Sequence, residues 1–376
     1  MDTKDQMDAT SRSQFNAPDT MMPDTGAIPI SPDITDPAQS MDLATPAAVD
    51  ERKLQKPPVS PFRESLQRLR RDKRAMVSIG VIGFFILVAI FGPFIYQHVD
   101  APSYTSHVDS QTYPATVYRN YYHGELDRQD ELPSSQYWLG TNEIGQDLLG
   151  RLMQGILVSL AVAFVVEIMD IVLGILVGVL AGYFGGWIDQ LLARFTDLMF
   201  AFPGLLFVIL LTGIFGSSAD DFFSHIPVIG PNGNARLLLV SLALAFTIWP
   251  LMARYVRGQT LQIKEQQFIE AARTSGTTNV RIIMRHIIPN LFSIVVVAAT
   301  LDISNTIIGE AGISLLGLGV QAPGSSLGLM IADASQYVST HPWEVLVPSV
   351  TLAIIVLTFS FFGDGLRDAF DPRSKD

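Results

Sequence analysis

The sequence contains no cysteine, so disulfide bonds and thiolate metal sites are excluded. It also contains no Gly-Lys dipeptide, which the phosphate-binding loop of P-loop NTPases requires. Charged residues make up only 16% of the 376 residues, against about 25% in soluble domains. Because 48% of the residues are hydrophobic, this composition favours a membrane protein that does not hydrolyse ATP by itself.

The N-terminal segment differs from the rest of the chain. Residues 1–50 hold nine Asp and two basic residues, and so contribute −7 to the net charge of −11. The segment is rich in Pro, Ser and Thr and has no apolar periodicity, so it cannot bury enough surface to fold. It also lacks the basic start and apolar core of a signal peptide. We expect residues 1–60 to form a disordered acidic cytoplasmic tail.

Long apolar runs follow the tail. A helix needs about 20 apolar residues to cross a bilayer core of about 30 Å. A soluble protein with this many buried helices would carry more charged residues in the connecting segments than this chain has. The sequence therefore predicts an all-α polytopic membrane protein with six transmembrane helices, at Ala75–Tyr96, Ile156–Leu180, Thr196–Phe215, Leu237–Tyr255, Leu291–Ile308 and Val345–Phe362.

The distribution of Lys and Arg predicts the orientation of these helices, because basic residues favour the cytoplasmic side. With the N-terminus inside, segments 51–75, 182–195, 253–288 and 364–376 hold 9, 1, 6 and 3 basic residues, or 19 in all. The outer segments 97–155, 216–236 and 309–344 hold 3, 1 and 0, or 4 in all. We therefore expect both termini to be cytoplasmic. Residues 61–96 then form the first helix with its basic anchor, and residues 97–155 form an extracytoplasmic loop.

A polar, basic segment, residues 265–290, separates the fourth and fifth spans on the predicted cytoplasmic side. Lys264–Gly276 predicts a short helix on which Phe268 and Ala272 share a face. Ala271 and Ala272 keep one side of this helix thin, a shape suited to a groove on another protein. The residues alone allow an ordinary loop equally well.

The segment continues beyond this helix. Gly276 predicts the end of the first helix, and a neighbouring Thr or Asn can cap a second one. The second helix, Val280–Ile288, would lie at the inner membrane surface with its Arg side chains at the headgroups. Pro289 would then begin the fifth span, where its missing N–H has no cost.

The sequence EAARTSG, followed by nine residues and HIIP, resembles the EAA loop of ABC importer permeases. The family pattern is EAA, three residues, Gly, nine residues, and an ending in Leu-Pro, where this chain has Ile288. In the family this loop is the coupling helix, which docks on the ATP-hydrolysing subunit. The resemblance implies that role for Phe268, Glu270, Ala271, Ala272, Gly276 and Pro289.

Other segments agree with this resemblance, which covers roughly residues 62–373. In Trp138–Gly155, Asn142 and Gln146 stand where the family usually has Asp and Arg. The resemblance points to the C-type permease of dipeptide, oligopeptide or nickel importers. The segments are Trp138–Gly155, Ala181–Leu206, Gly309–Pro323 and Phe361–Arg373.

The resemblance implies a type I importer permease fold, with residues 156–376 as the permease core and 257–290 as the coupling loop. It implies a multi-pass protein of the prokaryotic inner membrane, surrounded by lipid. The implied partners are a second, homologous permease, two ATP-binding subunits and an extracytoplasmic substrate-binding protein. ATP and Mg²⁺ would be bound by the ATP-binding subunits, so this chain is expected to be a non-catalytic subunit without a cofactor or a nucleic-acid partner.

Acidic residues in the spans are candidates for the substrate pathway. Glu167 and Asp170 share a face of the second span, where a charge costs about 3 kcal/mol or more. They could contact a cation or a peptide amine, but we favour an interior pair that is protonated or bonded to Ser, Thr or Asn. Asp302 in the fifth span is a candidate partner. Pro203 should bend or break the third span at the pathway wall.

Two further patterns predict structure. Asp147 and Arg151 have the i, i+4 spacing and order that favour an ion pair on a short outer helix. Gly174, Gly178 and Gly182 predict close helix packing in lipid. Carboxylates on facing helices could hold a metal through oxygen, but all six His lie outside the predicted spans, and we assign no metal ligand.

Other classes of function remain open from the residues. A nickel or other small-solute permease would carry the same motifs as a peptide permease. A secondary transporter would bind ions at broken helices and could use Glu167, Asp170, Asp302 and Pro203, but it has no use for the cytoplasmic helix pair. A membrane scaffold or receptor would explain the tail and the outer loops, but not the carboxylates.

Overall fold

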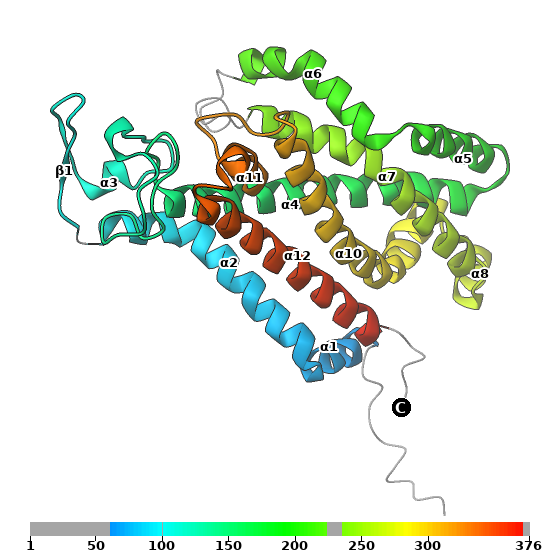
Figure 1. The fold of residues 1–376 in the computed structure, drawn as a ribbon. Coiled ribbons are helices and arrows are strands. Elements are labelled where there is room, and N and C mark those ends of the chain that lie inside the picture. The colour runs from blue at the N-terminus through cyan, green and yellow to red at the C-terminus, as the bar shows by residue number, and fades with distance from the viewer. Residues whose placement is uncertain (1–60, 100, 224–234, 371–376) are drawn as a thin grey trace, which may run out of the picture. The chain divides into compact units, whose positions relative to one another are not determined.

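The computed structural model describes residues 61–99, 101–223 and 235–370, which are mostly helical (Figure 1). The predicted acidic tail, residues 1–60, lies outside the described residues. The described chain opens with α1 (Pro61–Arg71), which carries three Arg in its last turn. Leu69 of this helix packs against Leu366 and Ala369, so the basic anchor sits against the last helix of the fold.

Five helices of the described chain are long and apolar enough to cross a membrane, or six spans if one bent pair counts as a single span. The predicted all-α, multi-span architecture is confirmed. One of the five, α10, is preceded without a break by residues 279–287. The five are α2 (Lys73–His98), α4 (Leu148–Phe184), α7 (Ala235–Lys264), α10 (Ile288–Leu315) and α12 (Pro342–Phe370).

The third predicted span is not one helix. α5 (Gly186–Ala201) and α6 (Gly204–Phe223) meet at an angle of 76°. Phe202 has an extended backbone, with φ −74° and ψ 132°, because the ring of Pro203 disfavours a helical conformation in the residue before it. The break predicted at Pro203 is therefore confirmed, and the predicted third span, Thr196–Phe215, corresponds to this bent pair of helices.

α4 is the longest helix of the fold and packs along α7 (Figure 1). A Cβ atom added to Gly178 would lie 2.6 Å from the Ala253 carbonyl oxygen, and one added to Gly182 would lie 2.7 Å from Thr260 Cβ. Gly174 is equally close to Met252. The predicted packing role of these glycines is confirmed, since larger residues would force α4 and α7 apart.

The segment between α2 and α4 folds back on itself. Strands β1 (Tyr104–Thr105) and β2 (Thr112–Tyr113) pair antiparallel, followed by α3 (Ala115–Tyr118) and a 3₁₀ turn, η2 (Leu126–Arg128). α4 begins at Leu148 rather than at Ile156, because Asp147 caps it. We call residues 99–147, which the sequence predicts to be extracytoplasmic, the outer loop. Between α10 and α12 lie the short, largely buried helix α11 (Leu327–Ala334) and the turn η4 (Ser335–Tyr337).

Candidate functional site

The segment that resembles the EAA loop forms a compact structure at the end of α7. Helix α8 (Gln267–Thr274) is joined to α9 (Asn279–Ile282), as the sequence predicted. Ile269 on α8 and Ile282 on α9 are both fully buried. They belong to one apolar cluster with Val256 of α7 and Leu291 of α10. The two short helices are thus fixed to the membrane helices by their own core.

The end of α8 has the geometry predicted for Gly276. This residue has φ +76°, a left-handed conformation that glycine adopts without strain. The Gly276 N–H donates to the Arg273 carbonyl at 2.9 Å, and the Thr277 N–H donates to the Ala272 carbonyl at 3.1 Å. This pair of bonds is a Schellman motif, which satisfies the last carbonyls of the helix.

The second helix does not stop before the fifth span. α9 continues through a π-helical turn, η3 (Ile283–Ile287), directly into α10. Pro289 lies in the first turn of α10 as predicted, and it has no N–H to donate back into the preceding turn. The wide turn of η3 accommodates this gap, and the side-chain amide of Asn290 donates to the His286 carbonyl at 2.5 Å. The predicted separation of the two helices is therefore wrong.

Several exposed residues of this segment are apolar. Phe268, Val280 and Met284 are 45%, 70% and 61% exposed. Ala271 is exposed beside Phe268 on α8, and we call these four residues the α8 face. The alanines do not share one free side, because Ala272 packs partly against the apolar cluster of the chain itself. The α8 face also has an acidic neighbour, Glu270, which is exposed, and it is bordered by exposed Arg273, Arg281 and Arg285.

Polar contacts hold the segment to the end of α4. Lys264, the last residue of α7, donates to the Gly182 carbonyl at 3.1 Å. The Tyr183 hydroxyl donates to Asn279 Oδ1 at 2.9 Å, and the Arg273 guanidinium lies 5.2 Å from the centre of the Tyr183 ring. Sequence reasoning missed these contacts, because Tyr183 and Asn279 are 96 residues apart.

The candidate pathway carboxylates lie inside the helix bundle. Glu167 is 4% exposed and Asp170 is fully buried, on one face of α4 as predicted. Asp302 of α10 is close enough to interact electrostatically with both, as the sequence suggested. Among the described residues, none donates a hydrogen bond to the carboxylate oxygens of Glu167 or Asp170. The predicted bonding of this pair to Ser, Thr or Asn is therefore not found in the described part of the chain.

Comparison with known proteins identifies the family. Residues 174–376 match the model of the family described as binding-protein-dependent transport system inner membrane component. The chain belongs to this family. Residues 60–113 match the N-terminal TM domain of oligopeptide transport permease C. The protein is therefore a multi-pass membrane permease subunit, and the resemblance seen in the sequence is confirmed.

Individual relatives are similar over most of their length. The dipeptide transport system permease protein DppC of Alkalihalophilus pseudofirmus is 35% identical over 84% of this chain and 91% of its own. The oligopeptide transport system permease protein OppC of Bacillus subtilis is 32% identical over 90% of this chain and 98% of its own. The glutathione transport system permease protein GsiD of Salmonella typhimurium is 36% identical over 84% and 92%.

The permease contains a buried carboxylate that sequence reasoning missed. Glu310 of α10 is almost fully buried and accepts hydrogen bonds from Ser159 at 2.8 Å and Ser314 at 2.7 Å. It thereby links α4 to α10. Glu310 lies in Gly309–Pro323, a segment that resembles the family, and this position was the sequence signal that could have identified it. Unlike Glu167 and Asp170, this carboxylate has its partners within the described chain.

The outer loop of the permease is tied down by a buried arginine. Arg119 donates to the carbonyls of Gln136 and Ser135 at 2.9 Å, and to those of Tyr96 and Val99 at 3.0 and 3.1 Å. Its guanidinium also lies 4.5 Å from the centre of the Tyr96 ring. One side chain thus fastens two parts of the outer loop to the end of α2.

Asp147 and Arg151 do not pair with each other as predicted. Asp147 is buried, caps α4 by accepting from the Gly150 N–H at 2.8 Å, and accepts from the Tyr96 hydroxyl at 2.6 Å. Arg151 instead donates to Asp333 at 2.8 Å and to Gln146 at 2.6 Å. The predicted i, i+4 pair is wrong, because an N-cap carboxylate faces the helix start rather than the next turn.

Proposed function

We propose that this permease is one half of the translocation pathway of an ATP-driven ABC importer for peptides. The substrate class is supported by the relatives, which are named for the transport of dipeptides, oligopeptides and glutathione. Their similarity extends over at least 84% of this chain. A second, homologous permease would supply the other half of the pathway. A substrate-binding protein would deliver the peptide on the side of the outer loop.

The α8 face is the proposed docking surface for an ATP-binding subunit. The observation that carries this proposal is its exposed Phe268, Val280 and Met284, in a polar, basic segment beyond the apolar part of the spans. Apolar anchors ringed by polar residues are typical of protein interfaces. Because Ile269 and Ile282 root the segment in the permease core, a push on this face would move α4, α7 and α10 together. ATP and Mg²⁺ would be held by the ATP-binding subunits, and this chain would perform no covalent chemistry.

The break at Pro203 and the carboxylates have separate proposed roles. We assign Pro203 to the wall of the pathway, where carbonyls freed by the break between α5 and α6 can be hydrated. Glu167, Asp170 and Asp302 are assigned to the interior of this chain, in protonated form, because the first two are buried among its own helices. A pathway between two permeases would need them at the surface of this one.

Substitution of Ala271 tests the docking proposal. Ala271→Trp adds a ring to an exposed position and leaves the apolar cluster of the chain untouched. Overpacking a close contact costs about 1–3 kcal/mol, which corresponds to roughly a 5- to 150-fold loss of affinity for the ATP-binding subunit. Membrane insertion should be normal, and peptide uptake should fall with the amount of ATP-binding subunit that co-purifies.

Gln266→Ala is the matched control, because Gln266 is exposed and its side chain caps no backbone group of α8. It should retain the ATP-binding subunit and transport at the parent rate. Ala272→Trp is less informative, since it would also disturb the apolar cluster. If Ala271→Trp retains its partner and transports peptide normally, the α8 face is not the docking surface.

A further inference from the structure

Three metal-ligating side chains from two distant segments meet beside the outer loop. Asp130 belongs to that loop, and His341 and Glu344 lie at the start of α12. One ligand atom from each residue lies within 4.8 Å of the other two. His341 Nδ1 is 3.8 Å from Asp130 Oδ1. Asp130 is held in place by its own backbone N–H, which donates to the Asn142 carbonyl at 3.0 Å.

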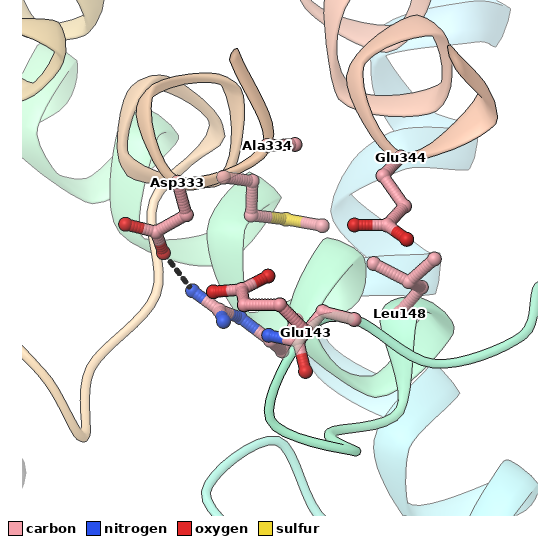
Figure 2. A pocket seen from close by; sticks show the side chains of 8 residues that line it. Glu143, Leu148, Asp333, Ala334 and Glu344 are labelled. Atoms are coloured by element: carbon pink, nitrogen blue, oxygen red, sulfur yellow. Dashed lines mark hydrogen bonds and ion pairs between the residues drawn. The ribbon is translucent and has the colours of Figure 1, made fainter. Parts of the chain in front are cut away.

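Glu344 is the unusual member of this cluster. It is 1% exposed, yet neither of its carboxylate oxygens has a hydrogen-bond partner among the described residues. A buried carboxylate without a partner is costly, and buried polar groups in native proteins are nearly always satisfied. Figure 2 shows Glu344 extending from α12 toward a pocket that Glu143 and Asp333 also line. Oδ1 of Asp130 and Oε2 of Glu143 are likewise buried without a partner in the described chain.

The Arg side chain in this pocket is already bonded to other groups. Arg151 lines the same pocket, but it is bonded to Asp333 and Gln146. Among the described residues, no Lys or Arg forms an ion pair with Asp130, Glu143 or Glu344. The site therefore holds three carboxylates beside His341 and an Arg that is already bonded to other groups.

The donor set defines the class of ligand. Carboxylate oxygens combined with one imidazole nitrogen suit borderline divalent metals such as Zn²⁺, with bonds of about 2.0–2.2 Å. Such bonds place tetrahedral ligands about 3.4 Å apart, so the three side chains need to close by only about 1 Å. We propose that Asp130, His341 and Glu344 bind one divalent metal ion. The ion would join the outer loop to α12.

This site does not depend on which substrate the permease carries. It lies at the opposite end of α4 from the α8 face, so it would act on the outer loop and not on the ATP-binding subunit. On the sequence, metal ligands were considered within the predicted spans, and none was assigned. Asp130 and Glu344 come from segments more than 200 residues apart, so the sequence alone does not bring them together. The alternative for the same geometry is a proton shared between Asp130 and Glu344, which would bind no metal.

Metal binding by the purified full-length permease distinguishes the two. The protein should be prepared without a polyhistidine tag, stripped with a chelator, and titrated with Zn²⁺ and then Mn²⁺. Elemental analysis after gel filtration should find one ion per chain, and bound metal should raise the melting temperature. His341→Ala and Glu344→Gln should each lower the affinity at least tenfold. His107→Ala, at an exposed His of the same loop, is the matched control and should bind like the parent.

Glu344→Gln also separates lost ligation from lost folding. It keeps the shape of the side chain and removes a buried charge, so the metal-free variant should melt at the same or a higher temperature than the metal-free parent. Its melting temperature should then no longer respond to metal. Equal Zn²⁺ binding by the parent, His341→Ala and Glu344→Gln would overturn the proposal, as would a parent that retains no stoichiometric ion.

Discussion

The two ends of α4 differ in what they bury and what they expose. At its beginning, Arg119, Asp147 and Arg151 are buried charges, each bonded to groups of the same chain. At its end, about 55 Å away at 1.5 Å per residue, Phe268, Val280 and Met284 are apolar and exposed. At the first end these three charges are satisfied within one chain, whereas the second end presents apolar side chains that the described chain leaves uncovered.

The largest expected effect is at the beginning of α4. Arg119→Ala would remove the donor to four carbonyls, of which that of Gln136 also accepts from the Tyr96 hydroxyl, and a buried group left unsatisfied costs about 1–3 kcal/mol. We expect at least about 3 kcal/mol of lost stability and rapid proteolysis of the outer loop, measured by thermal unfolding and limited digestion in detergent. Arg281→Ala, at an exposed Arg beside the α8 face, should leave both unchanged. Equal melting temperatures for the two variants would contradict the comparison.

The next effect is a pH dependence at Asp147. Burial raises the pKa of this carboxyl from 3.8 to about 6, against the opposing hydrogen bonds from Tyr96 and from the backbone of α4. The folded protein therefore holds this proton more tightly than the unfolded chain. Stability should fall as the pH rises from about 4 to about 6, by up to about 3 kcal/mol at 1.36 kcal/mol per pKa unit.

Asp147→Asn isolates this contribution, because Asn can still cap α4 and does not titrate. The melting temperature of the parent minus that of Asp147→Asn should decrease between pH 4 and pH 6 and then level off. Other titrating groups are common to both proteins and cancel in the difference. A difference that does not change over this range would show that the carboxyl titrates normally.

A smaller effect is expected at the α8 face. Phe268→Ala removes an exposed ring, so the stability of the permease should change by less than about 0.5 kcal/mol. If the ring anchors a partner, its loss should weaken binding of the ATP-binding subunit by about 1–2 kcal/mol, or roughly 5- to 30-fold. Binding to the purified permease measures this, with exposed Gln267→Ala as control. A Phe268→Ala variant that is destabilised but binds the ATP-binding subunit normally would show that Phe268 stabilises the permease instead of anchoring a partner.

The smallest effect on transport is expected at Glu167 and Asp170, between the two ends of α4. Glu167→Gln combined with Asp170→Asn mimics the protonated form of both side chains. If the pair is interior and uncharged, peptide uptake should stay near the parent rate. A large loss of uptake with normal binding of the ATP-binding subunit would instead place these carboxylates in the pathway.

The sequence predicted the features that depend on backbone conformation and spacing over a few residues. Gly276 ends α8 because of its left-handed backbone, and Pro203 breaks a span because of its ring. The shared face of Glu167 and Asp170 follows from their spacing on a helix. These features depend on residues only a few positions apart, so the sequence contains the information needed to predict them.

Features that depend on tertiary packing could not be predicted in this way. Arg151 pairs with Asp333, 182 residues away, rather than with Asp147. Ala272 turns toward the core and Ala271 away from it, because Ile269 sets how α8 sits on the apolar cluster. The continuous helix through η3 requires a wide turn, which helical periodicity does not reveal. The meeting of Asp130 with Glu344 depends on how the outer loop folds.

Thiol labelling of single-cysteine variants tests the difference between the two ends most directly. The chain has no native cysteine, so Val108→Cys in the outer loop and Thr278→Cys beside the α8 face would each report one exposed position. An impermeant reagent should label Val108→Cys in intact cells and Thr278→Cys only in inside-out vesicles. Bound ATP-binding subunits should protect Thr278→Cys and leave Val108→Cys accessible. Labelling of Thr278→Cys from outside, or at the same rate with and without those subunits, would contradict a cytoplasmic docking surface at this end.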